Sequence, residues 1–203
     1  MSLHTESTQT AGSTGAGSTP SSAGDAEPAS TGVVLRAPRI TDAARLWQIV
    51  DESKVLDVNS SYAYLLWCRD FATTSVVAER GGRVVGFVTG YLRPEAPGTL
   101  FVWQVAVDAD QRGRGVGVAM LDWLVAAVTA PGHPAGGAMT ALETTVSPDN
   151  SASIAMFASL ARRRGAEMVR SELFEPGVFP DSHEAEDLYR ISPIARKNER
   201  DHS

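Results

Sequence analysis

The sequence predicts a single α/β (α+β) domain that follows a low-complexity N-terminal segment. Three observations predict this class. Strand-like and helix-like patterns alternate over residues 33–192 in the order β-α-α-β-β-β-α-β-α-β-β. The chain has 203 residues, 43% of them hydrophobic, which suits one globular core. A glycine-rich loop joins a central strand to the next helix, which is an arrangement that suits an anion-binding site.

The domain begins with a short strand and two helices. Residues 33–35 read as the strand, and Thr41 is the expected N-cap of a helix whose apolar residues recur at helical spacing as far as Val50. A second helix is expected to begin near Asn59 or Ser60. Its expected apolar face carries Tyr62, Leu65 and Leu66.

A hairpin, a long strand and an apolar helix are expected next. Runs of β-branched residues at 75–78 and 84–88 flank Gly81-Gly82, and such a step predicts a hairpin because its turn needs positive φ. A strong strand is expected over 100–107. The glycine-rich loop follows and leads into an apolar helix over 118–128.

The last part of the domain is expected to be strand, helix and two strands. The strands are expected over 139–146, 168–174 and 188–191. The helix is expected over 151–164, with three arginines in its last turn and Gly165 as its C-terminal glycine.

Both ends of the chain differ in composition from the domain. Residues 1–32 hold 13 Ser or Thr, five Gly, three acidic residues and no Lys or Arg. Such a segment buries too little apolar surface to offset its ordering entropy, so we expect it to be disordered. It has neither the basic nor the apolar region of a secretory signal. We expect a polar C-terminal tail over 193–203.

Composition excludes several classes of function. The net charge of −6 leaves no basic excess for neutralising nucleic-acid phosphates. The single cysteine, Cys68, excludes an internal disulfide and a multi-cysteine metal site, and we expect no metal. No apolar run approaches the roughly 20 residues that cross a bilayer. We therefore expect a cytoplasmic protein that binds neither nucleic acid nor membrane.

The chemistry begins at the loop Arg112-Gly113-Arg114-Gly115-Val116-Gly117, between a strand and a helix. Glycines let backbone amides approach an anion closely, and a helix N-terminus favours negative charge. Arg112 and Arg114 can pair with phosphate oxygens. The loop lacks the lysine end of a P-loop and the spacing of a dinucleotide-binding fingerprint. It therefore predicts a pyrophosphate site of another kind.

This loop, in this order of elements, resembles the acetyl-CoA loop of the GCN5-related N-acetyltransferases. Further blocks resemble the branch that acetylates L-2,4-diaminobutyrate in ectoine biosynthesis. These blocks are DVNSSYAYLLWCRDF at 57–71, GFVTGY at 86–91, FVWQVAVD at 101–108 and LETTV at 142–146. The resemblance covers about 35–191. It implies a central mixed, mostly antiparallel sheet flanked by helices, and a homodimer.

The resemblance also implies roles for residues in the cofactor site. Acetyl-CoA would bind where a bulge splays the strand that precedes the loop. The Val105 amide would polarise the thioester carbonyl, and Val107 would align the pantetheine. The pyrophosphate would be held by the loop residues Arg112, Gly113, Arg114, Gly115, Val116 and Gly117. Asn150 is a further expected cofactor contact.

The amine substrate, L-2,4-diaminobutyrate, needs groups that attract it and accept a proton. A side-chain ammonium has a reference pKa near 10.4, so it must lose a proton before it attacks. Asp57 and Glu143 are the carboxylates expected to do this. Asp57 can instead be a turn residue. Glu143 lies in an apolar strand, where burying a carboxylate is costly and therefore indicates a specific role.

Three further residues are candidates for the substrate site. Tyr62 can bind the substrate or move a proton, and Trp103 can wall the amine pocket by cation–π contact, although both can equally be core aromatics. His183 lies in a polar loop that, in the family, reaches over the substrate. Cys68 is expected to be a small core residue.

One residue departs from the pattern of the wider superfamily. A tyrosine often follows Asn-x-x-Ser/Ala on the penultimate helix and protonates the leaving thiolate, but Phe157 occupies that position here. Either water protonates the thiolate, whose reference pKa is near 8.5, or another group such as Tyr62 replaces the tyrosine. Two alternatives to diaminobutyrate acetylation stay open: acetylation of a polyamine or amino sugar, and a CoA-binding module without catalysis.

Overall fold

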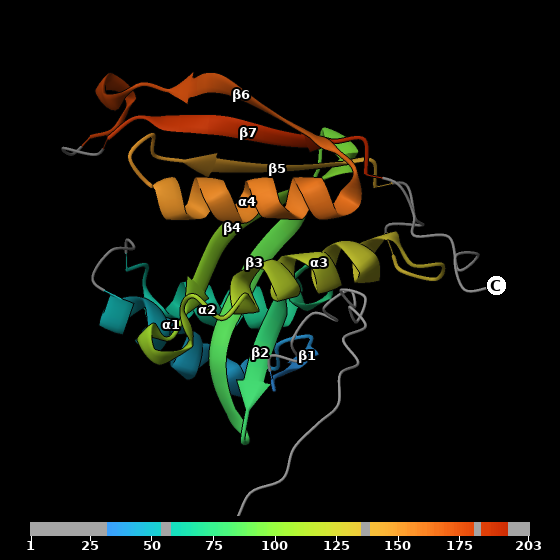
Figure 1. Ribbon diagram of the computed structural model, residues 1–203. Coiled ribbons are helices and arrows are strands. Elements are labelled where there is room, and N and C mark those ends of the chain that lie inside the picture. The colour runs from blue at the N-terminus through green and yellow to red at the C-terminus, as the bar shows by residue number, and fades with distance from the viewer. Residues whose placement is uncertain (1–31, 54–57, 135–138, 181–183, 195–203) are drawn as a thin grey trace, which may run out of the picture.

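The computed structural model describes residues 32–53, 58–134, 139–180 and 184–194 (Figure 1). Its strands are β1 Val34–Arg36, β2 Val76–Arg80, β3 Arg83–Arg93, β4 Ala96–Val107, β5 Ala141–Val146, β6 Glu167–Phe174 and β7 Glu186–Ser192. Its α-helices are α1 Ala43–Ser53, α2 Ser61–Asp70, α3 Val116–Thr129 and α4 Ser151–Arg164. The 3₁₀ turns η1 Ile40–Asp42 and η3 Ala109–Gln111 precede α1 and the glycine loop.

The seven strands of the described chain form one sheet in the order β1-β2-β3-β4-β5-β7-β6. Every neighbouring pair is antiparallel except β4 and β5, which are parallel. The mixed, mostly antiparallel sheet that the resemblance implied is therefore confirmed. The one parallel pair lies in the middle of the sheet and joins its N-terminal and C-terminal parts.

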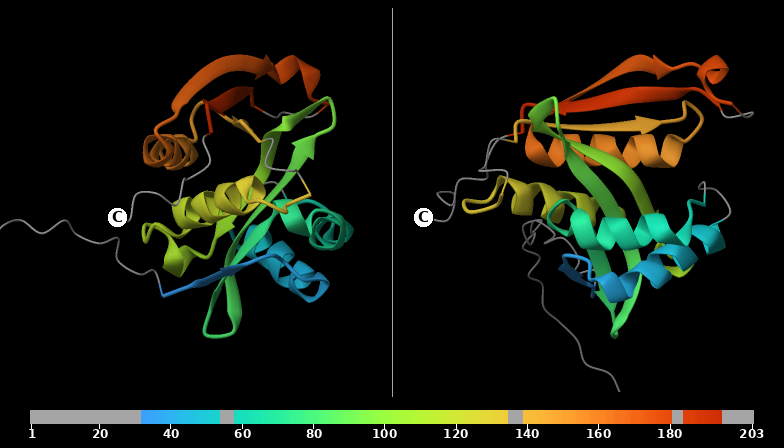
Figure 2. Two further views of the ribbon diagram at one scale, coloured as in Figure 1. Left: turned by 90° about the vertical axis from the view of Figure 1, so that its right-hand side faces the viewer. Right: turned by 180° about the vertical axis from the view of Figure 1, so that it is seen from behind.

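Helices cover both faces of the sheet (Figure 2). Successive strand residues point to opposite faces, so Val76 packs on the side of α3 and α4 while Val77 packs on the side of α1 and α2. Leu121 and Leu124 of α3 lie in the first cluster, and Leu46 of α1 lies in the second. Within the described ranges, none of the helices combines the length and the apolar character needed to cross a membrane.

The predicted order of elements is confirmed, and α4 has the predicted bounds, ending on Gly165 at φ 60°. The hairpin at Gly81-Gly82 is also confirmed, with φ of 58° and 79°. The β3–β4 hairpin is longer than expected, because pairing continues to Arg93 and Ala96 despite the neighbouring prolines.

Two details of the first helices were predicted wrongly. Thr41 does not cap α1: it lies inside η1, and the Asp42 carboxylate accepts the Arg39 amide at 2.7 Å instead. On α2 the buried face holds Tyr64 and Cys68, whereas Tyr62 is exposed. Apolar residues occur on several sides of α2, so spacing alone did not identify the side that meets the sheet.

Asp42 connects the start of α1 to the edge strand β1. Its carboxylate accepts hydrogen bonds from the Arg36 guanidinium at 2.7 and 3.0 Å, besides the one from the Arg39 amide. Burial by itself raises the pKa of Asp42, but these hydrogen bonds and the positive charge of Arg36 outweigh it. The pKa therefore lies below its ordinary value of 3.8.

Replacing Asp42 with Asn is expected to lower the free energy of unfolding by about 1–3 kcal/mol at neutral pH. Because the folded-state pKa is lowered, the carboxylate contributes stability above pH 3.8, and this contribution is lost as the pH falls through the folded-state value. Chemical denaturation over a pH series measures the difference between the two proteins. A difference that stays constant below pH 3.8 contradicts the expectation.

Candidate active site

The candidate site lies where β4 and β5 separate. Their parallel pairing covers four residue pairs, from Thr99–Ala141 to Val102–Thr144, and no strand of the described residues pairs with β4 on that side beyond Val102. The Thr144 hydroxyl donates to the Val102 carbonyl at 3.0 Å, at the point where the strands part. We call the space beyond this point the V. It opens between β4 on one side and β5 with the start of α4 on the other (Figure 1).

A β-bulge turns β4 away from β5. Thr89 of β3 pairs with Gln104 and Gly90 pairs with Val102, so Trp103 is an extra residue on β4. A Cβ atom on Gly90 would lie 2.7 Å from the Phe101 carbonyl oxygen, which only glycine avoids. The predicted bulge is therefore present, and a close backbone approach at Gly90 accompanies it.

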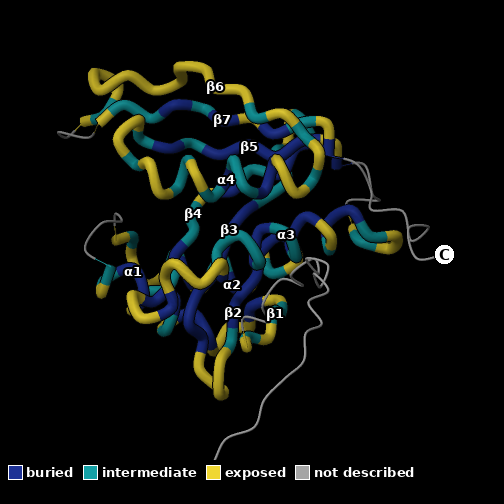
Figure 3. The backbone as a smooth tube through the Cα atoms, in the orientation of Figure 1, coloured by how far each residue is buried: buried dark blue, intermediate teal, exposed yellow. Residues whose placement is uncertain are grey.

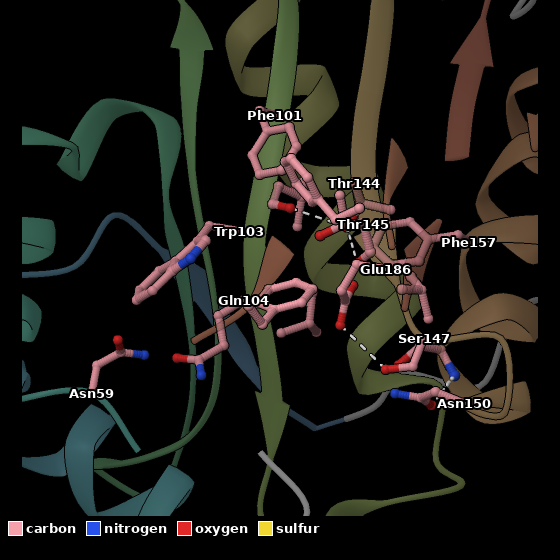
Figure 4. Close-up of a pocket in the computed structure, with 16 residues that line it drawn as sticks. Asn59, Phe101, Trp103, Gln104, Thr144, Thr145, Ser147, Asn150, Phe157 and Glu186 are labelled. Atoms are coloured by element: carbon pink, nitrogen blue, oxygen red, sulfur yellow. Dashed lines mark hydrogen bonds between the residues drawn. The ribbon is translucent and has the colours of Figure 1, made fainter. Parts of the chain in front are cut away.

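A groove of about 430 Å³ occupies the V (Figure 4). One wall is β4 from Phe101 to Val105, and the other is formed by 144–147 and the first turns of α4. Phe174, Phe179 and Glu186 close the groove from the β6–β7 side, and Asn59 reaches it from the start of α2. Residues far apart in the sequence therefore meet around one cavity.

The Val105 amide points into the V. The Asp108 amide donates to the Val85 carbonyl of β3 at 2.8 Å, whereas the Val107 carbonyl accepts from the Arg112 side chain on the other side of β4. Backbone groups of alternate residues in a strand point the same way. The Val105 amide therefore points to the side of β4 from which β5 has separated. A donor that polarises a carbonyl in the groove must point in this direction.

The glycine loop supplies amides without acceptors. Gly113 and Gly115 have φ of 72° and 76°, which favours glycine at both positions. In the described chain, no hydrogen bond is recorded from the amides of residues 113–117, and the first bond into α3 is from the Ala119 amide to the Gly115 carbonyl. Amides at a helix N-terminus without acceptors suit an anion such as a pyrophosphate.

The two arginines of the loop are placed differently. The Nε of Arg112 donates to the Val107 carbonyl at 3.1 Å, so the side chain is tethered beside the V. Its terminal nitrogens have no recorded partner in the described chain. Arg114 is exposed at the loop. Val107 itself packs against the core on the α3 side. The predicted loop residues therefore lie together at the open end of β4.

Trp103 lines the groove and belongs to an aromatic cluster. Its ring stacks on Trp67 of α2 with centroids 4.8 Å apart, and 36% of the residue is exposed. Tyr91 and Phe101 continue the cluster along the sheet. The stacking holds the Trp103 ring at the wall of the groove, where a cation can approach it.

Glu186 is the only charged residue among the described residues that line the groove. Its carboxylate accepts the Ser147 hydroxyl at 3.2 Å, and Figure 4 shows both side chains beside Asn150. The sequence alone does not point to Glu186, because it is one of four acidic residues in a polar stretch and nothing local distinguishes it from the others. The antiparallel pairing of β7 with β5 brings it to the V.

Tyr64 is a second residue that the sequence did not single out. It is fully buried, and its hydroxyl hydrogen-bonds with Asn59 and donates to Gln104 at 3.1 Å, both of which line the groove. Burial raises the pKa of Tyr64, and the hydrogen bonds with Asn59 and Gln104 oppose this rise only in part. Tyr64 therefore keeps its proton at neutral pH and fixes the two side chains.

Glu143 is buried outside the groove lining. Only 3% of it is exposed, and its two carboxylate oxygens accept hydrogen bonds from Arg93 and Arg190, the former at 2.7 Å. It pairs in register with Phe101, which does line the groove. The two arginines neutralise this carboxylate, which explains how it can be buried in an apolar strand. Both of its oxygens already accept a hydrogen bond from an arginine.

The other predicted residues are placed as follows. Tyr62 is 64% exposed on α2 and is not part of the groove lining. Asp57 and His183 lie outside the described residues. Asn150 lines the groove and also caps α4, because its Oδ1 accepts the Ser153 amide at 3.1 Å.

Phe157 lines the groove as a buried ring, so the position that holds a tyrosine in many superfamily members offers no proton here. Cys68 is buried in the core, and burial raises the pKa of its thiol to about 11. The described residues contain no group of three or more His, Cys, Asp or Glu placed to hold a metal ion.

Comparisons with known proteins identify the family of this chain. The profile of the Acetyltransferase (GNAT) family matches residues 42–161. A relative from Nocardia farcinica, named L-2,4-diaminobutyric acid acetyltransferase, is 62% identical over 81% of this chain and 82% of its own length. A relative of the same name from Streptomyces coelicolor is 54% identical over 78% of this chain and 91% of its own length.

A solved structure extends the similarity to three dimensions. It is the diaminobutyrate acetyltransferase EctA from Paenibacillus lautus, in complex with its substrate L-2,4-diaminobutyric acid and coenzyme A. The TM-score is 0.73 at 36% identity, with 81% of this chain and 97% of that chain covered. The chain therefore belongs to the GNAT family of acetyltransferases and, within it, to the group of the L-2,4-diaminobutyric acid acetyltransferases.

Proposed function

We propose that this protein transfers the acetyl group of acetyl-CoA to the γ-amine of L-2,4-diaminobutyrate, giving N-γ-acetyl-2,4-diaminobutyrate for ectoine biosynthesis. The observation that carries the proposal is the groove in the V, where the Val105 amide and the Glu186 carboxylate border one space beside a loop of amides without acceptors. The names of the relatives, at up to 62% identity, support the choice of amine.

The reaction joins the amine nitrogen to the acetyl carbon and breaks the carbon–sulfur bond of the thioester. Negative charge develops on the thioester oxygen during the attack, and the Val105 amide is our candidate donor to it. The amides of 113–117 and the Arg112 guanidinium hold the pyrophosphate in this proposal. Holding two substrates in one groove lowers the barrier, because the encounter becomes an intramolecular step.

The amine must lose one proton, and the CoA thiolate gains one. We assign Glu186 to attract the ammonium and accept its proton, directly or through water, because among the described residues it is the one carboxylate that lines the groove, and Ser147 orients it. Glu143 and the exposed Tyr62 remain weaker candidates, since the first is held by two arginines and the second faces away from the core. Water supplies the thiolate proton where Phe157 offers none.

We also propose a homodimer that acts in the cytoplasm. The resemblance to diaminobutyrate acetyltransferases supports the dimer, and the edge strand β6 is exposed except at Met168 (Figure 3). Val169 and Leu173 are exposed apolar side chains on this strand, and a second copy would cover them. Light scattering coupled to gel filtration tests the dimer.

A thiol-release assay with acetyl-CoA tests the main proposal. We expect rapid CoA release with L-2,4-diaminobutyrate and much slower release with lysine, ornithine and diaminopropionate, because the groove sets the distance between the amine and the α-carbon groups. Mass and NMR spectra of the product identify the acetylated nitrogen. A polyamine or amino sugar that outcompetes diaminobutyrate contradicts the substrate assignment. CoA binding without release for any amine indicates a binding module without catalysis.

Replacing Glu186 with Gln tests the proposed base. We expect kcat/KM for diaminobutyrate to fall by about a hundredfold or more, with CoA affinity unchanged, because the substitution keeps the shape and removes the proton acceptor. Glu95→Gln is the matched control, since it makes the same change at an exposed site between β3 and β4, outside the groove lining and outside β6.

The activity of Glu143→Gln shows whether Glu143 or Glu186 accepts the proton. If Glu143→Gln abolishes turnover in a stably folded protein while Glu186→Gln stays active, the proton acceptor is Glu143, and our assignment is wrong. Asp57→Asn in the same assay tests the remaining carboxylate that the sequence predicted.

A further inference from the structure

The segment that carries the glycine loop makes few hydrogen bonds of its own within the described residues. Beyond the 3₁₀ turn η3, the hydrogen bonds of residues 112–115 within the described residues are the Arg112 amide to the Ala109 carbonyl at 3.4 Å, the Arg112 side chain to the Val107 carbonyl, and the Ala119 amide to the Gly115 carbonyl at 3.0 Å. The amides of 113–117 have no recorded acceptor. The position of the loop therefore depends on the turn before it and on α3 after it.

Asp108 anchors the first end of this turn. It is 8% exposed, its amide continues the ladder to Val85, and its carbonyl accepts the Gln111 amide at 2.9 Å. Its carboxylate accepts two hydrogen bonds from one terminal nitrogen of Arg45 of α1, at 2.5 and 2.6 Å. Arg83 lies 3.7 Å away on the solvent side. A buried carboxylate needs such a partner, because its charge is costly to leave unpaired.

Arg45 is itself held in place. Its side chain is only 14% exposed, its Nε donates to the Val84 carbonyl at 3.2 Å, and its other terminal nitrogen contacts Glu52 at 3.3 Å. One guanidinium thus joins α1, β3 and the end of β4. The second end of the turn has a similar contact, since Arg80 of β2 donates to the side chain of Gln111 at 2.8 Å.

We propose that Arg45 and Asp108 are positioning residues for acetyl-CoA, which set the glycine loop from the opposite face of the sheet. This inference rests on the proposed function, because it assumes that the loop binds the CoA pyrophosphate. The pair does not touch the groove. It fixes the direction in which η3 leaves β4, and that direction decides where the amides of 113–117 point.

Calorimetric titration with CoA and steady-state kinetics test the inference. For Asp108→Asn we expect the Kd for CoA and the KM for acetyl-CoA to rise about tenfold, while kcat and the KM for diaminobutyrate stay unchanged. Asp108→Glu restores a carboxylate and is expected to recover part of the affinity. Arg45→Lys provides a second test, because one ammonium keeps the charge but does not reproduce the planar set of contacts.

Asp42→Asn is the matched control. It also removes the carboxylate of a largely buried Arg–Asp pair next to α1. This pair contacts β1, and its hydrogen bonds within the described residues do not reach η3 or the glycine loop. We expect a comparable loss of thermal stability and unchanged CoA affinity, with all titrations made well below the unfolding midpoints.

Two results overturn the inference alone. One is unchanged CoA affinity in both Asp108→Asn and Arg45→Lys, with the wild type binding normally. The other is an equal loss of affinity in Asp108→Asn and Asp42→Asn, which indicates general destabilisation. If the wild type binds no CoA, the proposed function fails and the inference fails with it.

Discussion

The backbone of β4 leaves β5 after the pair Val102–Thr144, because the extra residue Trp103 and the close approach of Gly90 to the Phe101 carbonyl turn the strand at that point. A strand in the middle of a sheet normally has partners on both sides, and unpaired backbone groups away from water are costly. Here the separation leaves one side of β4 without a strand. The groove, the orientation of the Val105 amide and the path to the glycine loop all follow from it.

A few charged groups at the site matter more for ligand binding in this domain than the net charge of the chain. The net charge of −6 gives no sign of a polyanionic ligand, yet the loop combines amides without acceptors with Arg112 and Arg114. Glu186 and Trp103 both line the groove, and a carboxylate and an aromatic ring are groups that suit an ammonium ligand. A few local groups therefore bind each substrate, and the net charge of the chain has little influence on the binding of acetyl-CoA or of the amine.

Buried arginine–carboxylate pairs support the site from outside. Glu143 with Arg93 and Arg190 lies beside the closed end of the V, and Asp108 with Arg45 lies at its open end. Such pairs are poor evidence for overall stability, because desolvation offsets much of their attraction. Their geometry is nevertheless directional, since a planar guanidinium fixes the groups that it joins. In this protein they join β5 and the end of β4, which border the groove, to elements outside its lining such as α1 and β3.

Sequence analysis predicted the order of the elements, the hairpin glycines, the end of α4 and the loop motif. These features depend on local properties, namely side-chain period, positive φ at glycine and the special composition of a loop. It selected Trp103, Val105 and Asn150, which do line the groove, from motif positions. It misjudged the buried face of α2, where several faces carry apolar residues, and therefore favoured Tyr62 over Tyr64.

The sequence by itself therefore determined the family, the elements and the anion loop. Only the tertiary structure decided which side chains share the groove. Glu186 reaches it through the pairing of β7 with β5, and Tyr64 acts on it through Gln104 and Asn59. Glu143 is drawn into ion pairs by arginines 50 and 47 residues away in the chain. Local patterns carry no information on such distant pairings, because strand order and register place these residues together.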